Sequence, residues 1–276
     1  MLLRQIFADN PFLLMALFAG LAASVAGGVI GTYVVTKRIV FISGSIAHAV
    51  LGGMGLALYL KRTLHLEWLK PIYGALLFAI LAAFLIGWIH LYYRQREDTV
   101  IASLWTSGMA LGVIFLSLTP GYNVEVLNFL FGNILWTSRQ DLFLLLGLDL
   151  LIFFVVYFFH RKFLAICFDE KQALLQGLRV KGLYFLLLAL VAITVVLLIQ
   201  VVGVILVIAI LSLPAAIANT FTNKFSSIMG FATLFGIVFT LVGISLSFLI
   251  NWPPGATIAL VTTVGYFTNL ICKKAS

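Results

Sequence analysis

The organisation of this chain is decided by residues 161–181, RKFLAICFDEKQALLQGLRVK. This island carries five basic and two acidic residues and includes a short helix-forming phrase, DEKQALLQG, from Asp169 to Gly177. The blocks on either side, 141–160 and 183–200, are predominantly apolar. Each is about long enough, as a helix, to cross the roughly 30 Å hydrocarbon core of a bilayer. The pattern therefore predicts a polar island between two transmembrane helices, and such an island is suited to meeting a soluble partner.

Apolar blocks of similar length recur along the whole chain, which is 63% hydrophobic and only 9% charged. This composition excludes a soluble globular domain, because too few polar atoms remain to cover its surface. We predict an all-α, polytopic transmembrane bundle that forms one domain over residues 1–276. The expected spans are 12–36, 39–60, 71–93, 99–119, 141–160, 183–200, 203–221, 227–250 and 255–272. Gly203 and Pro214 interrupt the seventh block, which is either a full span, giving nine, or a broken or re-entrant segment, giving eight.

The positions of Lys and Arg predict the orientation in the membrane. With nine spans, twelve of these residues fall on one side, among them Lys37, Arg38 and the basic residues of the island, and five fall on the other. The richer side is expected to face the cytoplasm. The N-terminus is then outside, and the island and the C-terminus are inside. The basic residues that give the net charge of +8 lie mainly in loops next to the spans. The charge therefore does not indicate a nucleic-acid partner.

Enzyme motifs are missing from the sequence. It contains no GxxxxGK[ST] loop for ATP, no GxSxG and no HExxH, and we expect neither enzyme activity nor a bound cofactor. Cys167 and Cys272 are far apart and form no CxxC pair, so they predict neither a disulfide framework nor a zinc site. Energy for uphill transport would have to come from a partner or from an ion gradient.

His48 is the ionisable residue that points most clearly to transport. It lies about nine residues into the second span, roughly 13 Å deep, where a titratable group is costly and usually faces a cavity or a partner. One helical stripe carries Gly44, His48, Gly52 and Gly55, with Ser45 on its flank. This lane of small residues leaves room either for a passing ion or for a second helix.

Asp149 is the other deep ionisable group, in the middle of LLLGLDLLIFF. It fits either a proton or cation site or an acid paired with a polar group on another helix. Leu145 and Phe153, one turn away on either side, are apolar and cannot share a bound ion.

Glycines at four-residue spacing predict close helix contacts, because small residues let backbones approach one another in lipid. Two such steps are Gly27–Gly31 and Gly108–Gly112. Gly52, on the stripe of His48, is a further candidate for helix packing.

Several segments together resemble the permease subunit of the bacterial metal-ion (zinc/manganese/iron) ABC transporters, the ABC-3 family. The resemblance covers about residues 12–272. It rests on Lys37-Arg38 followed by FISGSIAHAVL (41–51), on EDT (97–99), on LFGN (130–133), on the Asp169–Gly177 phrase, and on VGVIL (202–206) through LPAAIA (213–218).

This resemblance implies a type II ABC importer fold in the bacterial cytoplasmic membrane, with a divalent metal ion as the substrate. The implied partners are a second permease subunit, a separate cytoplasmic ATPase that uses the ATP, and an extracytoplasmic metal-binding protein. The island would be the coupling element that inserts into the ATPase, and the residues carried over to that role are Asp169, Glu170, Lys171, Ala173, Leu174 and Gly177. The metal pathway would be lined by His48, with Gly44 and Ser45 beside it and Asp149 as a further candidate.

The sequence departs from the family at two acidic positions. The family motif has an acid one helical turn before the histidine, where this chain has Gly44, and often an aspartate where this chain has Asn133. A pathway that keeps imidazole but loses carboxylate favours zinc or iron over manganese. Two other transport hypotheses remain: a permease for a metal chelate of the siderophore or cobalamin type, and a proton-coupled carrier that uses Asp149.

Overall fold

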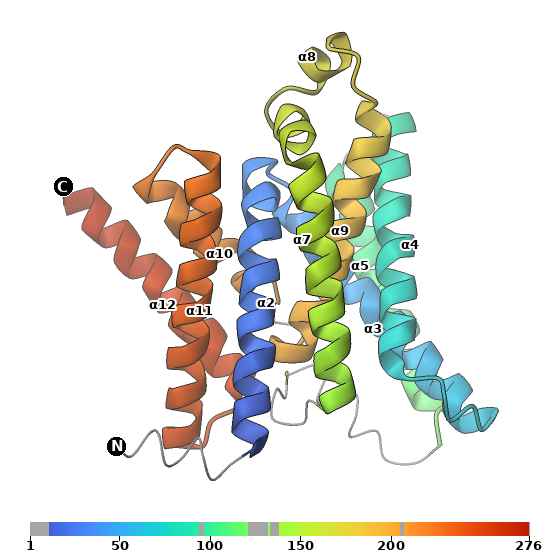
Figure 1. Ribbon diagram of the computed structural model, residues 1–276. Coiled ribbons are helices and arrows are strands. Elements are labelled where there is room, and N and C mark those ends of the chain that lie inside the picture. Colours follow the sequence, from blue (N-terminus) through green and yellow to red (C-terminus); the bar gives the residue numbers. More distant parts are fainter. Residues whose placement is uncertain (1–10, 94–96, 121–131, 133–137, 205–206, 276) are drawn as a thin grey trace. The chain divides into compact units, whose positions relative to one another are not determined.

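The computed structural model describes residues 11–93, 97–120, 132, 138–204 and 207–275. Every regular element in this part of the chain is an α-helix (Figure 1), which confirms the predicted all-α fold. The helices are α2 (Pro11–Thr36), α3 (Val40–Thr63), α4 (Pro71–Tyr92), α5 (Glu97–Leu118), α7 (Arg139–Phe168), α8 (Glu170–Leu175), α9 (Val180–Val202), α10 (Val207–Phe221), α11 (Phe225–Ile250) and α12 (Pro254–Ala275).

Eight helices of the described residues are long and apolar enough to cross a membrane, namely α2, α3, α4, α5, α7, α9, α11 and α12. The seventh predicted span, 203–221, corresponds to α10, an apolar helix that is shorter than a full span. Gly203, at a left-handed φ of 87°, ends α9, and its N–H donates to the Ile199 carbonyl at 2.9 Å. The 15 residues of α10 then continue through Pro214. The interruption therefore lies at Gly203 rather than at the proline.

The chain packs into two compact units, each made of segments distant in the sequence. Unit 1 comprises Met1–Val35, Asn128–Phe154 and Leu197–Ser276, and unit 2 comprises Thr36–Leu127 and Val155–Val196. Both α7 and α9 contribute residues to each unit. The single transmembrane domain expected over residues 1–276 stays a prediction.

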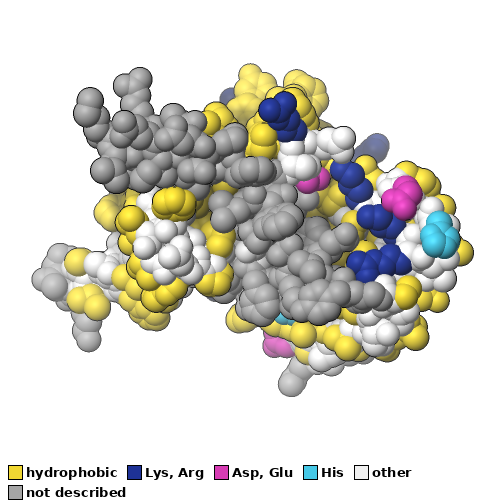
Figure 2. Space-filling model, turned by 90° about the horizontal axis from the view of Figure 1, so that it is seen from below, with side chains coloured by type: hydrophobic (Ala, Val, Ile, Leu, Met, Phe, Trp, Pro, Cys, Tyr) yellow, Lys and Arg dark blue, Asp and Glu magenta, His cyan; other side chains and the backbone are white. Residues whose placement is uncertain are grey.

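Large apolar side chains are exposed along the outer helices, as a lipid-facing surface requires. Examples are Leu81, Phe84 and Trp88 on α4, and Leu150 and Phe158 on α7. In contrast, 83% of the apolar window of α3 is buried, against 17% for α5, so α3 is an inner helix of unit 2. Figure 2 shows one face from below, on which several Lys and Arg side chains lie among hydrophobic and uncharged side chains.

Glycine contacts explain how α3 packs so closely inside unit 2. A Cβ added to Gly108 of α5 would lie 2.5 Å from the Cα of Ala49, and one added to Gly112 would lie 2.7 Å from the Cγ of Leu51. Gly53 and Gly74, which the sequence patterns did not single out, bring α3 and α4 together. A Cβ on either of these two glycines would overlap the carbonyl oxygen of the other.

The two glycines of the step on α2, Gly27 and Gly31, differ in how closely they are packed. In unit 1, a Cβ on Gly31 would overlap the carbonyl of Leu211 in α10. Gly27 would make only an ordinary contact, 3.5 Å from the side chain of Leu198. Of these two glycines, Gly31 is thus the one that sets the distance between α2 and α10.

Replacing Gly108 with alanine is expected to destabilise the packing of α3 against α5 by about 1–3 kcal/mol, the usual cost of overpacking. Alanine is otherwise the better helix former, so the sign of the effect depends on the contact. The matched control is Gly230→Ala on α11, where a Cβ would meet nothing within 4 Å. Thermal unfolding of the purified protein in detergent should show a lower melting temperature for Gly108→Ala alone, and an equal or higher one would contradict the packing role.

The island differs from its expected boundaries. The fifth span was predicted to end at residue 160, but α7 continues to Phe168, and α9 begins at Val180 rather than at residue 183. No helix breaker lies between 160 and 168, and Phe163 and Ile166 are fully buried, so the helix gains from continuing. Only the segment from Asp169 to Arg179 therefore projects beyond the long helices.

Candidate functional site

His48 lies on α3 and is nearly buried, with 9% of its surface exposed. Its ring stacks on the indole of Trp105 from α5, with the ring centroids 3.9 Å apart and the planes inclined by 24°. One turn before it, Ser45 donates a hydrogen bond to the carbonyl of Ile101 at 3.1 Å, again on α5. The imidazole is therefore held in a fixed position between two helices of unit 2.

A backbone contact defines which ring nitrogen of His48 is available. Nδ1 lies 2.8 Å from the carbonyl oxygen of Gly44, one turn earlier on the same helix. Since a carbonyl only accepts, Nδ1 carries the proton in this hydrogen bond, and the neutral ring keeps its lone pair on Nε2. Pinning one nitrogen to a backbone carbonyl is the usual way in which proteins orient a metal-binding histidine.

The lane of small residues beside His48 is occupied by a helix. Cβ atoms on Gly52 and Gly55 would each lie 3.0 Å from carbonyl oxygens of α5, those of Gly108 and Gly112. The sequence left open whether this stripe makes room for an ion or for a second helix. At Gly52 and Gly55 it contacts a second helix. Among the described residues, no three His, Cys, Asp or Glu side chains come together as a metal site. His48 is therefore a single potential ligand rather than part of a complete set.

Asp149 belongs to unit 1, whereas His48, Ser45 and Gly44 belong to unit 2. The Oδ1 atom of Asp149 is buried and lacks a hydrogen-bond partner among the described residues. Asn133, the second position at which the family's acid is replaced, lies outside the described residues. The roles of His48, Ser45, Gly44 and Asp149 in a metal pathway stay predictions.

The second candidate region is α8, a six-residue helix that is capped at both ends. Asp169 is its N-cap, and Oδ1 accepts hydrogen bonds from the backbone N–H groups of Lys171 at 2.8 Å and Gln172 at 3.1 Å. Such a cap typically contributes about 1 kcal/mol. Gly177 has a left-handed φ of 79°, and the N–H of Leu178 returns to the carbonyl of Ala173 at 3.1 Å. This is a Schellman ending, and it explains why so short a helix has a defined shape.

Two features hold α8 against the rest of unit 2, namely a buried side chain and an ion pair. Ala173 is almost completely buried, with 1% exposed. Glu170 forms an ion pair with Lys37, whose Nζ lies 2.5 Å from Oε1. The two acids of the island therefore have roles inside the chain, Asp169 as a cap and Glu170 as an ion-pair partner. Their predicted part in docking the ATPase remains untested.

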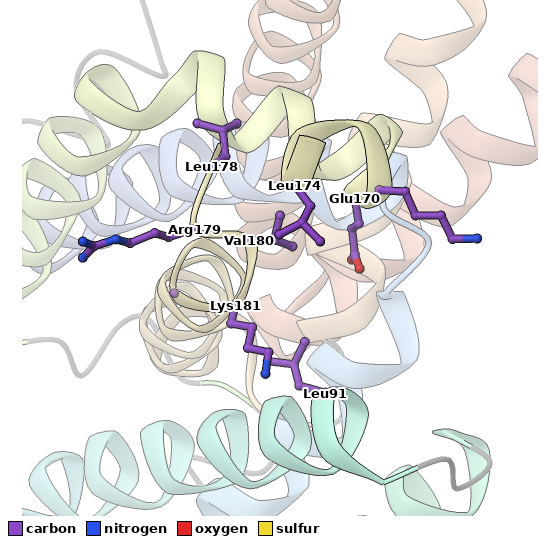
Figure 3. Close-up of a pocket in the computed structure, with 9 residues that line it drawn as sticks. Leu91, Glu170, Leu174, Leu178, Arg179, Val180 and Lys181 are labelled. Atoms are coloured by element: carbon purple, nitrogen blue, oxygen red, sulfur yellow. The ribbon is translucent and has the colours of Figure 1, made fainter. Parts of the chain in front are cut away.

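The second half of α8 exposes two large apolar side chains, next to the exposed Lys171 and Gln172 of its first half. Leu174 is 64% exposed, Leu175 is 87% exposed, and Phe168, at the end of α7, is 73% exposed. Beside them is an open groove of about 660 Å³. It is lined by Leu91, Glu170, Lys171, Leu174, Leu178, Arg179, Val180, Lys181 and Gly182. Figure 3 shows Leu174 and Val180 close together, while Arg179 and Lys181 extend in different directions.

Lys37, Trp105 and Leu175 are three potentially functional residues that the sequence patterns did not single out for any role. Lys37 entered as a basic residue of the turn that the family resemblance includes, but not as a partner of Glu170, because that contact spans 133 positions. Trp105 carries no motif, since stacking depends on how α5 lies against α3. Leu175 stands inside the helical phrase, and only its exposure distinguishes it from a core leucine.

A bundle of helices long and apolar enough to span a membrane, with one short capped helix outside them, defines the class of a polytopic membrane protein. The sequence of the chain identifies which one. A family model described as the ABC 3 transport family matches residues 9–273, and the chain belongs to this family. It is accordingly a multi-pass membrane component of a transporter and not itself an enzyme, as the sequence predicts.

Individual relatives agree with this assignment. The chain is 50% identical to a probable metal transport system membrane protein of Chlamydia pneumoniae, over 95% of this chain and 89% of that one. It is 31% identical to the manganese transport system membrane protein MntC of Halalkalibacterium halodurans, over 91% and 84% of the two chains. A solved structure, PsaBC from Streptococcus pneumoniae in complex with Fab, matches with a TM-score of 0.86 at 27% identity, covering 98% of this chain and 95% of that one.

Proposed function

We propose that this chain is the permease subunit of an ABC transporter that imports a divalent transition-metal ion across the cytoplasmic membrane. Membership of the ABC 3 transport family and relatives named for metal transport support the substrate class. ATP is hydrolysed by a separate subunit, because the sequence has no phosphate-binding loop of its own. A second permease subunit and an extracytoplasmic metal-binding protein complete the assembly.

The observation that carries this proposal is the pair of exposed leucines in the second half of α8. A helix of six residues that is capped at both ends and exposes Leu174 and Leu175 to water gains from burial against another protein. The basic residues near it favour the cytoplasmic side of the membrane. A cytoplasmic ATPase is the partner that both features suit, with α8 seated in a groove of its surface.

The metal is expected to pass His48, through Nε2. One imidazole is a weak site, and weak binding suits a pathway, since an ion has to leave as readily as it enters. In a dimer of two such permeases, the two His48 imidazoles could together bind the passing ion. Glycine at position 44 leaves the site without the family's carboxylate, so we propose zinc or iron rather than manganese as the preferred ion.

Uptake into proteoliposomes tests the function. The permease, its ATPase and its binding protein would be reconstituted with radiolabelled zinc, iron or manganese outside and ATP inside. We expect accumulation of zinc or iron to exceed that of manganese, and to stop when the ATPase carries an inactivated Walker A lysine. Metal accumulation that continues with the inactivated ATPase would contradict the ABC mechanism.

Asp149 discriminates the ABC importer from a proton-coupled carrier. Asp149→Asn removes the carboxylate without changing its size. We expect ATP-driven metal uptake by this variant to stay within about twofold of the unmodified protein if the metal passes His48 without Asp149, the further candidate that the sequence offered for the pathway. Uptake should also survive collapse of the proton gradient by an ionophore. Loss of uptake in both tests would instead favour proton coupling through Asp149.

A further inference from the structure

Lys37 has an unusual position for a lysine in a membrane protein's connecting turn. It lies between α2 and α3, and its side chain is only 13% exposed. Its Nζ donates to the carbonyl oxygen of Ile166 at 2.7 Å and pairs with Oε1 of Glu170 at 2.5 Å. The same Nζ lies 5.9 Å from the centre of the Tyr184 ring. One ammonium group thus contacts α7, α8 and α9.

This contact pattern differs from that of an ordinary surface ion pair. Exposed pairs contribute little, because water competes for both charges. Here the lysine is largely withdrawn from water and its remaining protons face a carbonyl and an aromatic ring. Glu170 is 33% exposed, so losing its carboxylate would leave the more deeply buried ammonium group of Lys37 without its charged partner. The geometry of the turn is therefore tied to the position of Glu170.

The turn itself leads to the candidate pathway. The chain passes from unit 1 to unit 2 between Val35 and Thr36, immediately before Lys37. Three residues after Lys37, Val40 begins α3, which carries His48. A rigid helix transmits displacement of its first turn to its later turns. Any movement of α8 that pulls on Glu170 therefore acts on the start of the helix that holds the imidazole.

We infer that Lys37 is a positioning residue that transmits movement of α8 to α3 and so couples ATP hydrolysis to opening of the metal pathway. This inference rests on the proposed function of α8 as the ATPase-docking helix. Lys37 does not contact the ATPase or the metal. Its role is to make α8 and the first turn of α3 move together.

The test compares Lys37→Met with Arg38→Met in the reconstituted transporter. Arg38 is the adjacent basic residue of the same turn and is exposed, so it controls for the loss of one positive charge. We expect Lys37→Met to bind the ATPase within about twofold of the unmodified permease and to hydrolyse ATP. Metal uptake per ATP hydrolysed should fall about tenfold. Arg38→Met should leave this ratio unchanged.

A double-variant cycle with Glu170 makes the inference specific. Glu170→Gln alone should lower the ratio of uptake to hydrolysis as Lys37→Met does, and the double variant should be no worse than either. An unchanged ratio in Lys37→Met, or additive losses in the double variant, would overturn the inference. So would loss of ATPase binding in both single variants, since Lys37 would then only hold α8 in place. If the unmodified permease fails to bind the ATPase, the proposed function itself is contradicted, and the inference that depends on it is contradicted as well.

Discussion

Replacing His48 with alanine is expected to lower ATP-driven uptake of zinc about tenfold or more, without dissociating the ATPase. Removing even an indirect partner of a metal site commonly costs 10–100-fold, and His48 is the one deep imidazole on α3. The helix also loses its stacking contact with Trp105, so part of the effect of alanine will come from the cavity left behind. Uptake in proteoliposomes, normalised to the amount of assembled complex, measures the transport effect separately.

His48→Asn separates the ligand from the packing. An asparagine amide reaches about as far as Nδ1 and can still donate to the carbonyl of Gly44, but nothing replaces Nε2. We therefore expect His48→Asn to lose uptake nearly as fully as alanine does while keeping more of the thermal stability. Trp105→Phe is the matched control, because a phenyl ring preserves a stacking surface and leaves both ring nitrogens of His48 in place. Undiminished uptake by His48→Asn would remove this imidazole from the pathway.

Gly44→Asp extends the same prediction to metal choice. It restores a carboxylate one helical turn before His48, where the family motif has its acid. Hard anionic oxygen raises the affinity for manganese more than it does for zinc, relative to a site with imidazole alone. We expect the ratio of manganese to zinc uptake to rise in this variant. An unchanged ratio would mean that the ion is selected elsewhere, for example by the binding protein.

The helical fold was predictable because lipid imposes it. Backbone groups in the hydrocarbon core must be satisfied within a helix, so apolar blocks of about twenty residues were sufficient to locate α2, α3, α4, α5, α11 and α12. The boundary at Phe168 was missed because charge was taken to mark the end of the span. Arg161 and Lys162 are both exposed and lie on the outside of a helix whose other side still packs through Phe163 and Ile166.

For each candidate site, the sequence predicted only the residues that lie on one helix. Position on one helix placed Gly44, Ser45 and His48 together, since residues one turn apart share a face. What completes each site comes from another helix. The stacking of Trp105 and the pairing of Lys37 with Glu170 depend on how helices pack, which hydrophobic periodicity does not encode. The close contact of Gly53 with Gly74 was missed for the same reason, because neither belongs to a GxxxG step.

Leu175→Glu is expected to weaken binding of the ATPase by about 30-fold, which corresponds to about 2 kcal/mol, the loss typical of a central interface residue. The leucine is 87% exposed, so the substitution costs the folded permease little. In a complex, however, the new carboxylate would be withdrawn from water without a partner. Leu174→Glu should act in the same direction, and both variants should lose metal uptake in parallel with binding.

Reversing the charges of Asp169 and Glu170 would be a less informative test of docking. Asp169 caps α8 and Glu170 pairs with Lys37, so a defect could arise from an unravelled helix or from repulsion between Lys37 and a second positive charge at position 170. The matched control for Leu175→Glu is Gln172→Glu, which adds the same charge at an exposed position in the first half of α8, where the helix dipole favours it. Binding of the purified ATPase to immobilised permease gives the affinities directly. Equal affinity for Leu175→Glu and Gln172→Glu would show that the leucine side of α8 does not face the ATPase, and the exposed leucines would then require another partner.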